Sequence, residues 1–224
     1  MEGLNSSYRT LRLNYQKILK QRNQLLRKAD ELSRHALLTQ LEPWTGQLIE
    51  AGSRMIAERA LWIECLNTTL PGIHEQYAAV DGVIALHYTP HVTDAEHFRV
   101  ALEERQEEEI IRGVTVVGPQ RDNITASLDG NDLQHYGSQG QHRSVVISLK
   151  IAEVQLAKRQ TGRTPILLLD DVASELDPTR LAAFFTALQD QTCQIILTTV
   201  HVGDIMDNTA HGSSTLAVCE GVLS

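Results

Sequence analysis

Cysteine is scarce in this 224-residue chain, and its scarcity excludes one class of fold. The three cysteines, Cys65, Cys193 and Cys219, lie far apart, and no CxxC pair occurs. A set that is odd in number and sparse argues against a disulfide framework and indicates a reducing compartment. No apolar run approaches the ~18 residues of a membrane-spanning helix, and no apolar segment follows a basic start as it does in a secretory signal. These absences make the cytoplasm the expected location.

Aromatic residues are also few, at 4% of the sequence, so the core is expected to be mostly aliphatic. The net charge of -8 argues against a surface that is basic throughout. Residues 1–34 nevertheless carry eight basic and three acidic side chains, a local net charge of +5. Such an asymmetry indicates a local nucleic-acid contact, and a solvated helix face is the alternative. The candidate DNA-contacting residues are Arg9, Arg12, Lys17, Lys20, Arg27 and Lys28.

The first 80 residues show a helical pattern of apolar side chains. One stripe covers residues 4–36 in alternating steps of four and three, with Arg22 as a break. A second stripe covers residues 48–77 after a turn expected at Pro43, and Pro71 predicts a kink or break. Two long helices with a short link predict an antiparallel helical arm over residues 1–80. Two ordinary bundle helices are the alternative.

Residues 81–224 have the pattern of an α/β lobe, in which short apolar runs predict strands with helices between them. The predicted strands are 83–86, 124–128, 166–169, 194–198 and 216–219, and the predicted helices are 94–111, 141–161 and the segment from 178 onward. The glutamates of the acidic helix are expected on a solvated face. The run 166–169 is apolar throughout, as expected for a strand buried on both faces of a parallel sheet. The alternation of strands and helices across residues 124–224 predicts one α/β layer.

Two carboxylates, Asp170 and Asp171, directly follow this apolar run. They stand at the carboxyl end of the strand, where open α/β sheets bind ligands. One acid at this place can hold the Mg²⁺ that bridges nucleotide phosphates. The second can orient or deprotonate an attacking water. For two aspartates taken alone, a turn or a helix cap is the alternative.

Two further segments flank the paired aspartates along the chain. The segment 138–141, Ser-Gln-Gly-Gln, opens a helix, where a hydroxyl, a glycine and exposed N–H groups can form an anion site. A flexible loop whose serine caps the helix is the alternative. Ser174 and Asp177 follow the aspartates, and Asp177 directly before Pro178 is also suited to capping the next helix.

The order and spacing of these segments resemble the ABC-type ATPases, including their SMC-like DNA-repair branch. Three stretches narrow the resemblance: Gly-Pro-Gln-Arg-Asp at 118–122, Gly-Ser-Gln-Gly-Gln-His-Arg-Ser at 137–144 and Leu-Lys-Ile-Ala-Glu at 149–153. With them, the chain resembles the RecF family over essentially its whole length, most closely from residue 113 to residue 197. The fold implied is the C-terminal lobe of an ABC-type ATPase with a parallel sheet over residues 81–224, preceded by the helical arm.

The resemblance implies a role for each segment. Asp170 would be the Walker B ligand of Mg²⁺, and Asp171 would occupy the position of the catalytic base, where many relatives have glutamate. Residues 138–141 (Ser138, Gln139, Gly140 and Gln141) would form the signature loop, which contacts the γ-phosphate of ATP bound to the opposite subunit. Ser174 and Asp177 would belong to the D-loop at the dimer interface.

The resemblance also implies a function. A RecF-like DNA repair and replication protein would bind single-stranded DNA and single-strand/double-strand junctions in an ATP-dependent manner, in recombination mediation and the SOS response. ATP and Mg²⁺ would be its cofactors. Its partners would be DNA and a second copy in an ATP-dependent homodimer, with RecO and RecR as further candidates.

Two departures from the family pattern limit this expectation. No GxxxxGK[ST] sequence occurs in the chain, so it is expected to be a C-terminal portion without the Walker A lobe and to hydrolyse little or no ATP by itself. Thr199 stands at the expected switch position, with His201 two residues on. A non-catalytic DNA-binding or interaction fragment is therefore the alternative function. An SMC-type structural ATPase would need far longer coiled-coil arms.

Overall fold

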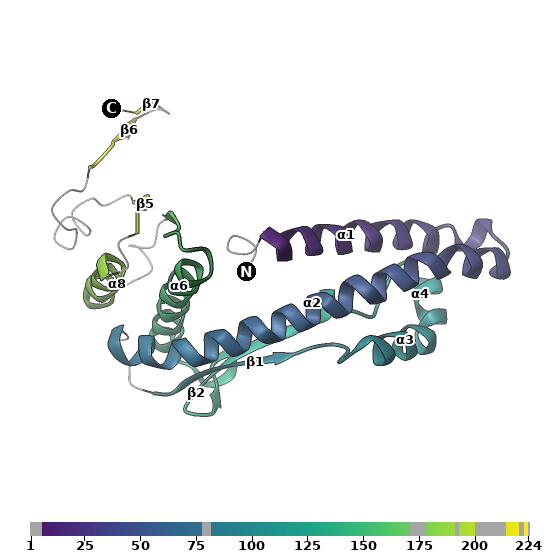
Figure 1. Ribbon diagram of the computed structural model, residues 1–224, viewed down its shortest axis with the longest axis horizontal. Coiled ribbons are helices and arrows are strands. Elements are labelled where there is room, and N and C mark those ends of the chain that lie inside the picture. The colour runs from purple at the N-terminus through teal and green to yellow at the C-terminus, as the bar shows by residue number, and fades with distance from the viewer. Residues whose placement is uncertain are drawn as a thin grey trace. The chain divides into compact units, whose positions relative to one another are not determined.

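The computed structural model describes residues 6–77, 82–170, 178–190, 193–199, 214–219 and 222–223 (Figure 1). The chain divides into two compact units. The arm unit comprises Met1–Thr68 and Ile84–Tyr136, and the lobe unit comprises Thr69–Val83 and Gly137–Ser224. This boundary differs from the predicted division at residue 80, because residues 84–136 pack with the helices of the arm. The functional division at residue 80 stays a prediction.

The arm unit is built on two antiparallel helices, α1 (Ser6–Leu26) and α2 (Arg34–Tyr77). The predicted stripes form their contact: Tyr15 and Ile18 of α1 lie in one buried cluster with Leu48 and Met55 of α2. The helical arm is therefore confirmed. Among the described residues, no helix is both long and apolar enough to cross a membrane.

The predicted turn at Pro43 is wrong, because Pro43 lies inside α2. The chain reverses instead through a short 3-10 helix, η1 (Ala29–Glu31), and the Ser33 hydroxyl accepts a hydrogen bond from the Ala36 amide at the start of α2. Pro71 also lies within α2, so the helix is not broken there, while the kink that was the other predicted outcome stays a prediction. Prolines usually weaken a helix interior, but buried residues lie on both sides of each one: Leu41 and Leu48 around Pro43, and Leu70 and Ile73 around Pro71.

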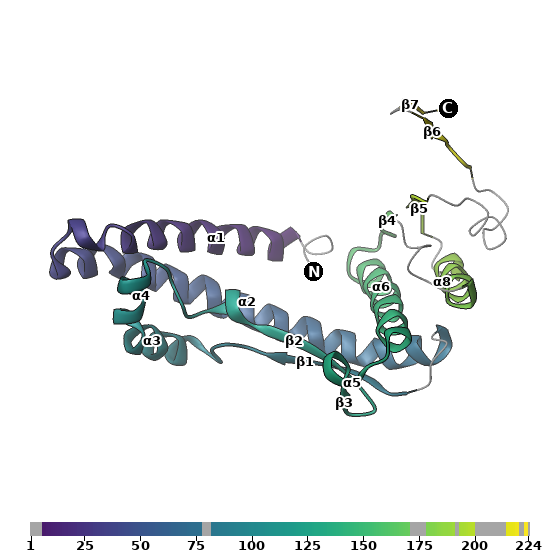
Figure 2. The same cartoon turned by 180° about the vertical axis from the view of Figure 1, so that it is seen from behind.

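A three-stranded antiparallel sheet in the order β1-β2-β3 accompanies the helices of the arm unit (Figure 2). Its strands are β1 (Ile84–Thr89), β2 (Asn123–Leu128) and β3 (Asn131–Asp132). The turn predicted at residues 129–131 is confirmed, with Asp129 and Gly130 both at positive φ (52° and 78°). The sheet ends in the short helix α5 (Leu133–Tyr136). The strand predicted at 124–128 thus pairs with β1. The prediction that it belongs to the parallel layer is wrong.

The free edge of β1 is occupied by one side chain of α2. Asn67 donates from Nδ2 to the Leu86 carbonyl at 2.8 Å, and its Oδ1 accepts from the Leu86 amide at 2.7 Å. Leu86 is paired with Ala126 of β2 on its other side. The backbone of Leu86 is thereby satisfied by a side-chain amide where a fourth strand would otherwise lie.

The predicted acidic helix is two helices, α3 (Ala95–Glu104) and α4 (Gln106–Arg112), separated at Arg105. Most of its glutamates are on the surface, but Glu109 is fully buried and forms an ion pair with Arg22 at 2.7 Å. The expectation of a wholly solvated face is therefore wrong at Glu109. Arg22, which interrupts the apolar stripe, is the buried partner that compensates its charge.

The lobe unit contains the predicted parallel pair, β4 (Leu167–Leu169) and β5 (Ile195–Leu197). Two long helices accompany it, α6 (Gln139–Thr161) and α8 (Pro178–Asp190). Leu181 and Phe185 of α8 pack against Leu197 of β5. A short antiparallel pair, β6 (Val218–Cys219) and β7 (Val222–Leu223), follows.

One face of the parallel pair is covered and the other is not. Leu169 is 8% exposed, whereas Leu168 is 71% and Ile196 is 51% exposed. Leu168 and Ile196 stand opposite each other in the register, so they share the uncovered face. The prediction of a strand buried on both faces is therefore wrong for the part of the lobe that the structure describes.

Candidate nucleotide and nucleic-acid sites

Asp170 lies at the carboxyl end of β4, as predicted. The Thr198 hydroxyl donates to Asp170 Oδ1 at 2.6 Å, and the Thr198 amide donates to the Leu169 carbonyl at 3.0 Å. The Asp170 side chain is exposed, and its second oxygen has no hydrogen bond to another described residue. A carboxylate held on one oxygen and open on the other suits Mg²⁺, which prefers one or two carboxylates together with waters and phosphate oxygens.

Thr198 is the site residue that the sequence reasoning missed. Leu169 pairs with Leu197, so the next residue of each strand, Asp170 and Thr198, emerges at the same edge of the sheet. Had the register been known, this pairing could have been predicted. Thr199, the predicted switch position, follows directly in the described chain.

Ser138 is the N-cap of α6 and takes part in a reciprocal capping box. Its hydroxyl accepts from the Gln141 amide at 3.2 Å, and the Gln141 side-chain oxygen accepts from the Ser138 amide at 2.8 Å. The capping alternative is thus correct in geometry, yet it leaves the amides of Gln139 and Gly140 outside the box. Those amides and the Ser138 hydroxyl hydrogen remain donors at the positive end of a helix of 23 residues.

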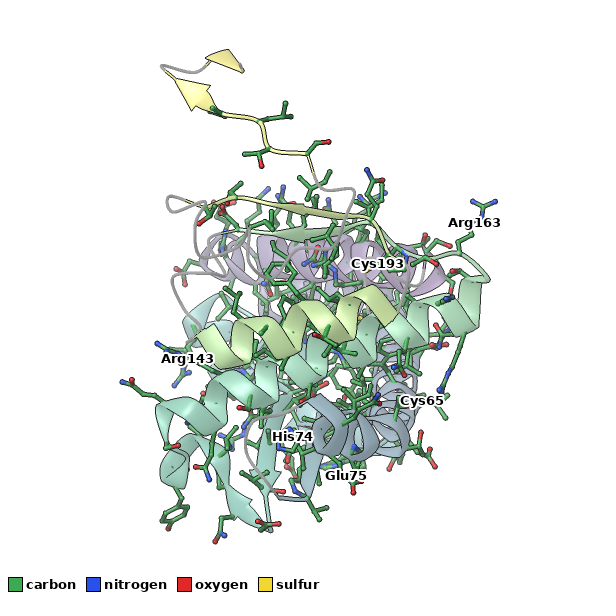
Figure 3. The ribbon with its side chains drawn as sticks, turned by 90° about the vertical axis from the view of Figure 1, so that its left-hand side faces the viewer. Cys65, His74, Glu75, Arg143, Arg163 and Cys193 are labelled. Carbon is green, nitrogen blue, oxygen red and sulfur yellow. The ribbon has the colours of Figure 1, made fainter. Side chains whose placement is uncertain are left out.

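The start of α6 is fixed to the end of α2 by a buried polar contact (Figure 3). His74 Nδ1 lies 2.9 Å from the Ser148 hydroxyl, which donates to the Ser144 carbonyl at 3.0 Å. Since that hydroxyl already donates, His74 Nδ1 carries the hydrogen in this pair. All three residues are almost completely buried, so the contact holds the first turns of α6 against α2.

Three of the predicted site residues lie outside the described residues: Asp171, Ser174 and Asp177, as does His201. Their roles stay predictions. Within the described ranges, no hydrogen bond or ion pair joins Asp170 to residues 138–141, and no group of three acidic, histidine or cysteine side chains could hold a metal. The described part of the lobe therefore holds the acid and the capped start of α6 as two separate features.

The basic residues of the arm differ in exposure: some lie on the surface and others are buried. Helix α1 contains no aspartate or glutamate along its 21 residues. Five of the six predicted DNA contacts are exposed, on α1 or directly after it, namely Arg9, Lys17, Lys20, Arg27 and Lys28. At 100° per residue, Arg9 and Lys20 of α1 point in nearly the same direction and Lys17 lies beside them, while Arg27 and Lys28 directly follow the helix. Together they make an acid-free basic face, called here the α1 basic face.

The sixth predicted contact, Arg12, is half-buried and lies outside this face. Arg22 is buried and fully engaged: its guanidinium donates to Thr45, Thr115 and Glu109. A count of charges could not show that Arg12 and Arg22 differ in exposure from the other basic residues. That difference depends on which side of α1 packs against α2. Tyr8 and Tyr15 lie on the buried side, so α1 offers no aromatic ring on its outer face.

The lobe and the arm together define the class of protein. The architecture is that of the C-terminal lobe of an ABC-type ATPase with its arm: a parallel strand that ends in an aspartate, a capped glycine-containing loop that opens a helix, and an antiparallel helical arm.

No protein-family model matches the chain. Similarity to individual proteins is extensive. The DNA replication and repair protein RecF of Geobacter metallireducens is 36% identical over 206 residues, which cover 88% of this chain and 54% of that protein.

A second relative of the same name, from Oceanobacillus iheyensis, is 34% identical over 219 residues, or 94% of this chain and 59% of that protein. A solved structure described as the recombination mediator protein RecF-ATP in the RecFOR pathway matches with a TM-score of 0.78 and 26% identity, covering 99% of this chain and 59% of its own. Over the residues it covers, the chain is similar to proteins of the RecF family. It spans between half and two thirds of the length of these relatives.

Proposed function

We propose that this chain provides the arm and the second ATPase lobe of a RecF-type protein of DNA replication and repair. The identity of 34–36% across most of the chain to proteins of that name supports the proposal. The activity is ATP-dependent binding to single-stranded DNA and to single-strand/double-strand junctions, in recombination mediation and the SOS response. Its setting is the cytoplasm, and its further partners are a second copy of the chain and the mediators RecO and RecR.

The lobe supplies one half of a composite ATP site. Asp170 is the Mg²⁺ ligand and Asp171 the base. Residues 138–141 contact the γ-phosphate of a nucleotide held by another subunit, and Ser174 and Asp177 form the D-loop. The open oxygen of Asp170 and the free amides at the start of α6 support this division, because each feature can receive its ligand without touching the other.

The expected behaviour of the chain alone is little or no ATP turnover, because the sequence holds no GxxxxGK[ST] loop to cradle the β- and γ-phosphates. Phosphate release is measured with and without Mg²⁺ for the wild type and for Asp171→Asn. Turnover in the wild type that disappears in Asp171→Asn would contradict this expectation.

The composite site itself is tested by adding the chain to a full-length RecF protein chosen because its sequence contains a GxxxxGK[ST] loop. Stimulated turnover that is lost with Ser138→Arg, and kept with the cap-preserving Ser138→Asn, supports a role in trans. Equal stimulation by all three forms would argue that the signature loop takes no part.

The arm supplies the DNA contact through the α1 basic face, and the observation that carries this assignment is the absence of any acid on α1. Exposed lysines and arginines neutralise phosphates and release counterions, so affinity falls steeply with salt. Since both tyrosines of α1 are buried, the contact is with the phosphate backbone and not with stacked bases.

DNA binding is tested by fluorescence anisotropy between 50 and 200 mM salt on single-stranded, duplex and junction probes. Losing the two charges in Lys17→Gln/Lys20→Gln is expected to reduce the slope of log K against log salt by about 1.8, or ~0.9 for each phosphate contact. The matched control, Arg159→Gln/Arg163→Gln, removes two exposed charges from the lobe unit and should leave the slope unchanged. Equal effects of the two pairs, or salt-insensitive binding by the wild type, would contradict the proposal.

A further inference from the structure

The loop Gly118–Asp122 is held in place by several polar contacts with the rest of the arm unit. Arg59 donates to the Pro119 carbonyl and to Asp122 Oδ2, each at 2.6 Å. Asp122 also accepts from the Tyr88 hydroxyl at 2.5 Å and from the His91 amide at 2.9 Å. Burial, followed by the bond to Asp122, raises the pKa of Tyr88 above its ordinary value, so the phenol remains a donor.

The middle of the loop is fixed as firmly as its end. The Tyr15 hydroxyl donates to Gln120 Oε1, and Gln120 Nε2 donates to the Val117 carbonyl at 2.9 Å. Gly118 has φ of +128°, and a Cβ there would lie 2.7 Å from the Tyr15 hydroxyl oxygen and 2.8 Å from Phe98 Cζ. Only glycine fits this position without displacing its neighbours.

Arg121 differs from the rest of this loop. Its side chain is exposed and has no hydrogen bond or ion pair among the residues that the structure describes. The nearby carboxylate, Asp122, is 3% exposed and already paired with Arg59, so it does not neutralise Arg121. The loop therefore carries one unpaired positive charge on a rigid backbone.

The loop lies beside the first turns of α1. Arg59 donates to the Tyr8 hydroxyl from Nε at 2.9 Å while its Nη1 holds Pro119 and Asp122. Tyr8 directly precedes Arg9 of the α1 basic face. Arg59 thus ties the loop that carries Arg121 to Tyr8, the residue next to Arg9 at the start of α1.

We infer that the loop Gly118–Asp122 serves to present Arg121 to a phosphate group of bound nucleic acid, as an extension of the α1 basic face. A guanidinium matches phosphate oxygens with two parallel hydrogen bonds, and a rigid base reduces the entropy lost when they form. The acid-free helix beside it suits a polyanion, and the similarity to DNA replication and repair proteins favours a nucleic acid as that polyanion. The inference rests on the DNA binding proposed above and adds a residue to it.

The test compares Arg121→Gln, Arg121→Lys and the control Arg163→Gln in the full chain. Arg163 is likewise an exposed arginine on a turn, and it extends away from the ribbon after α6 (Figure 3). With a duplex probe at 50 mM salt, Arg121→Gln is expected to weaken binding roughly three- to tenfold and to lower the salt slope by about 0.9. Arg121→Lys keeps the charge without the fork, so it should restore the slope and only part of the affinity.

The outcomes separate this inference from the DNA-binding proposal. If the wild type binds and Lys17→Gln/Lys20→Gln weakens binding, but Arg121→Gln matches Arg163→Gln, the role of Arg121 is overturned and an acidic protein surface becomes its expected partner. If the wild type does not bind DNA at all, the proposed function fails first. Unchanged unfolding of Arg121→Gln, followed by tryptophan fluorescence, shows that any loss of binding is local.

Discussion

The buried pair of Arg22 and Glu109 gives the sharpest test of how the arm unit is held together. Glu109 is fully buried, and its two oxygens accept from Arg22 at 2.7 Å and from the Val116 amide at 2.8 Å. Arg22 further donates to Thr45 at 3.1 Å and to Thr115 at 2.7 Å. Removing the carboxylate in Glu109→Ala leaves a guanidinium with no opposite charge in the interior and a backbone amide with no acceptor.

Breaking a buried pair from one side costs about 3–5 kcal/mol, because the remaining charge has lost its compensation. We therefore expect Glu109→Ala to lower the free energy of unfolding of the arm unit by ~3–5 kcal/mol. Replacing both partners by apolar residues of similar volume, in Arg22→Met/Glu109→Leu, should cost much less than the two single changes added together. The difference measures the coupling between the two side chains.

Tryptophan fluorescence in urea is a suitable assay, because both tryptophans of the chain, Trp44 and Trp62, lie in the arm unit. The signal therefore reports this unit without a contribution from the lobe unit. Unfolding is compared at one pH and one salt concentration for the wild type, Glu109→Ala, the single variants Arg22→Met and Glu109→Leu, and the double variant that combines them. A loss below about 1 kcal/mol for Glu109→Ala, or strictly additive single effects, would refute the reasoning.

Two further predictions concern helix starts. Asp94 caps α3 by accepting from the His97 amide at 2.9 Å, and this backbone hydrogen bond is the main reason that the pKa of Asp94 lies below its ordinary 3.8. The contribution of the Asp94 carboxylate to stability is present above pH 3.8 and is lost as the pH falls through the lowered pKa. The stability of Asp94→Asn should therefore depend less on acid than that of the wild type, as measured by urea unfolding from pH 7 to pH 3. Ser138→Ala removes the cap of α6 and should lower the free energy of unfolding by about 1 kcal/mol, whereas Ser138→Asn keeps a capping side chain and should not. Unfolding of the lobe followed by circular dichroism distinguishes the two variants. Equal stability of both would argue against the capping box.

Local patterns were enough to predict much of the fold. The apolar spacing at Leu48, Met55 and Trp62 places all three in the buried face of α2. The Asp129-Gly130 turn follows from residues that tolerate positive φ. In both cases, the deciding interactions involve neighbours within a few positions along the chain.

The features that the sequence did not reveal depend on distant partners. Glu109 looked like part of a solvated acidic face because its partner, Arg22, is 87 residues away. Pro43 looked like a turn because the packing that stabilises α2 on both sides is tertiary. At the candidate site, the capping role of Ser138 was visible locally, whereas the contact of Asp170 with Thr198 required the register of two strands.

The amide of Asn67 has a consequence for how the molecule behaves in a concentrated solution. An edge strand with unpaired N–H and C=O groups is a template on which another chain can add a strand and begin to aggregate. Leu86 lies in the middle of such an edge, and Asn67 occupies both of its outward backbone groups. One side chain thus blocks the middle of this edge, where an added strand would have to form its own backbone hydrogen bonds.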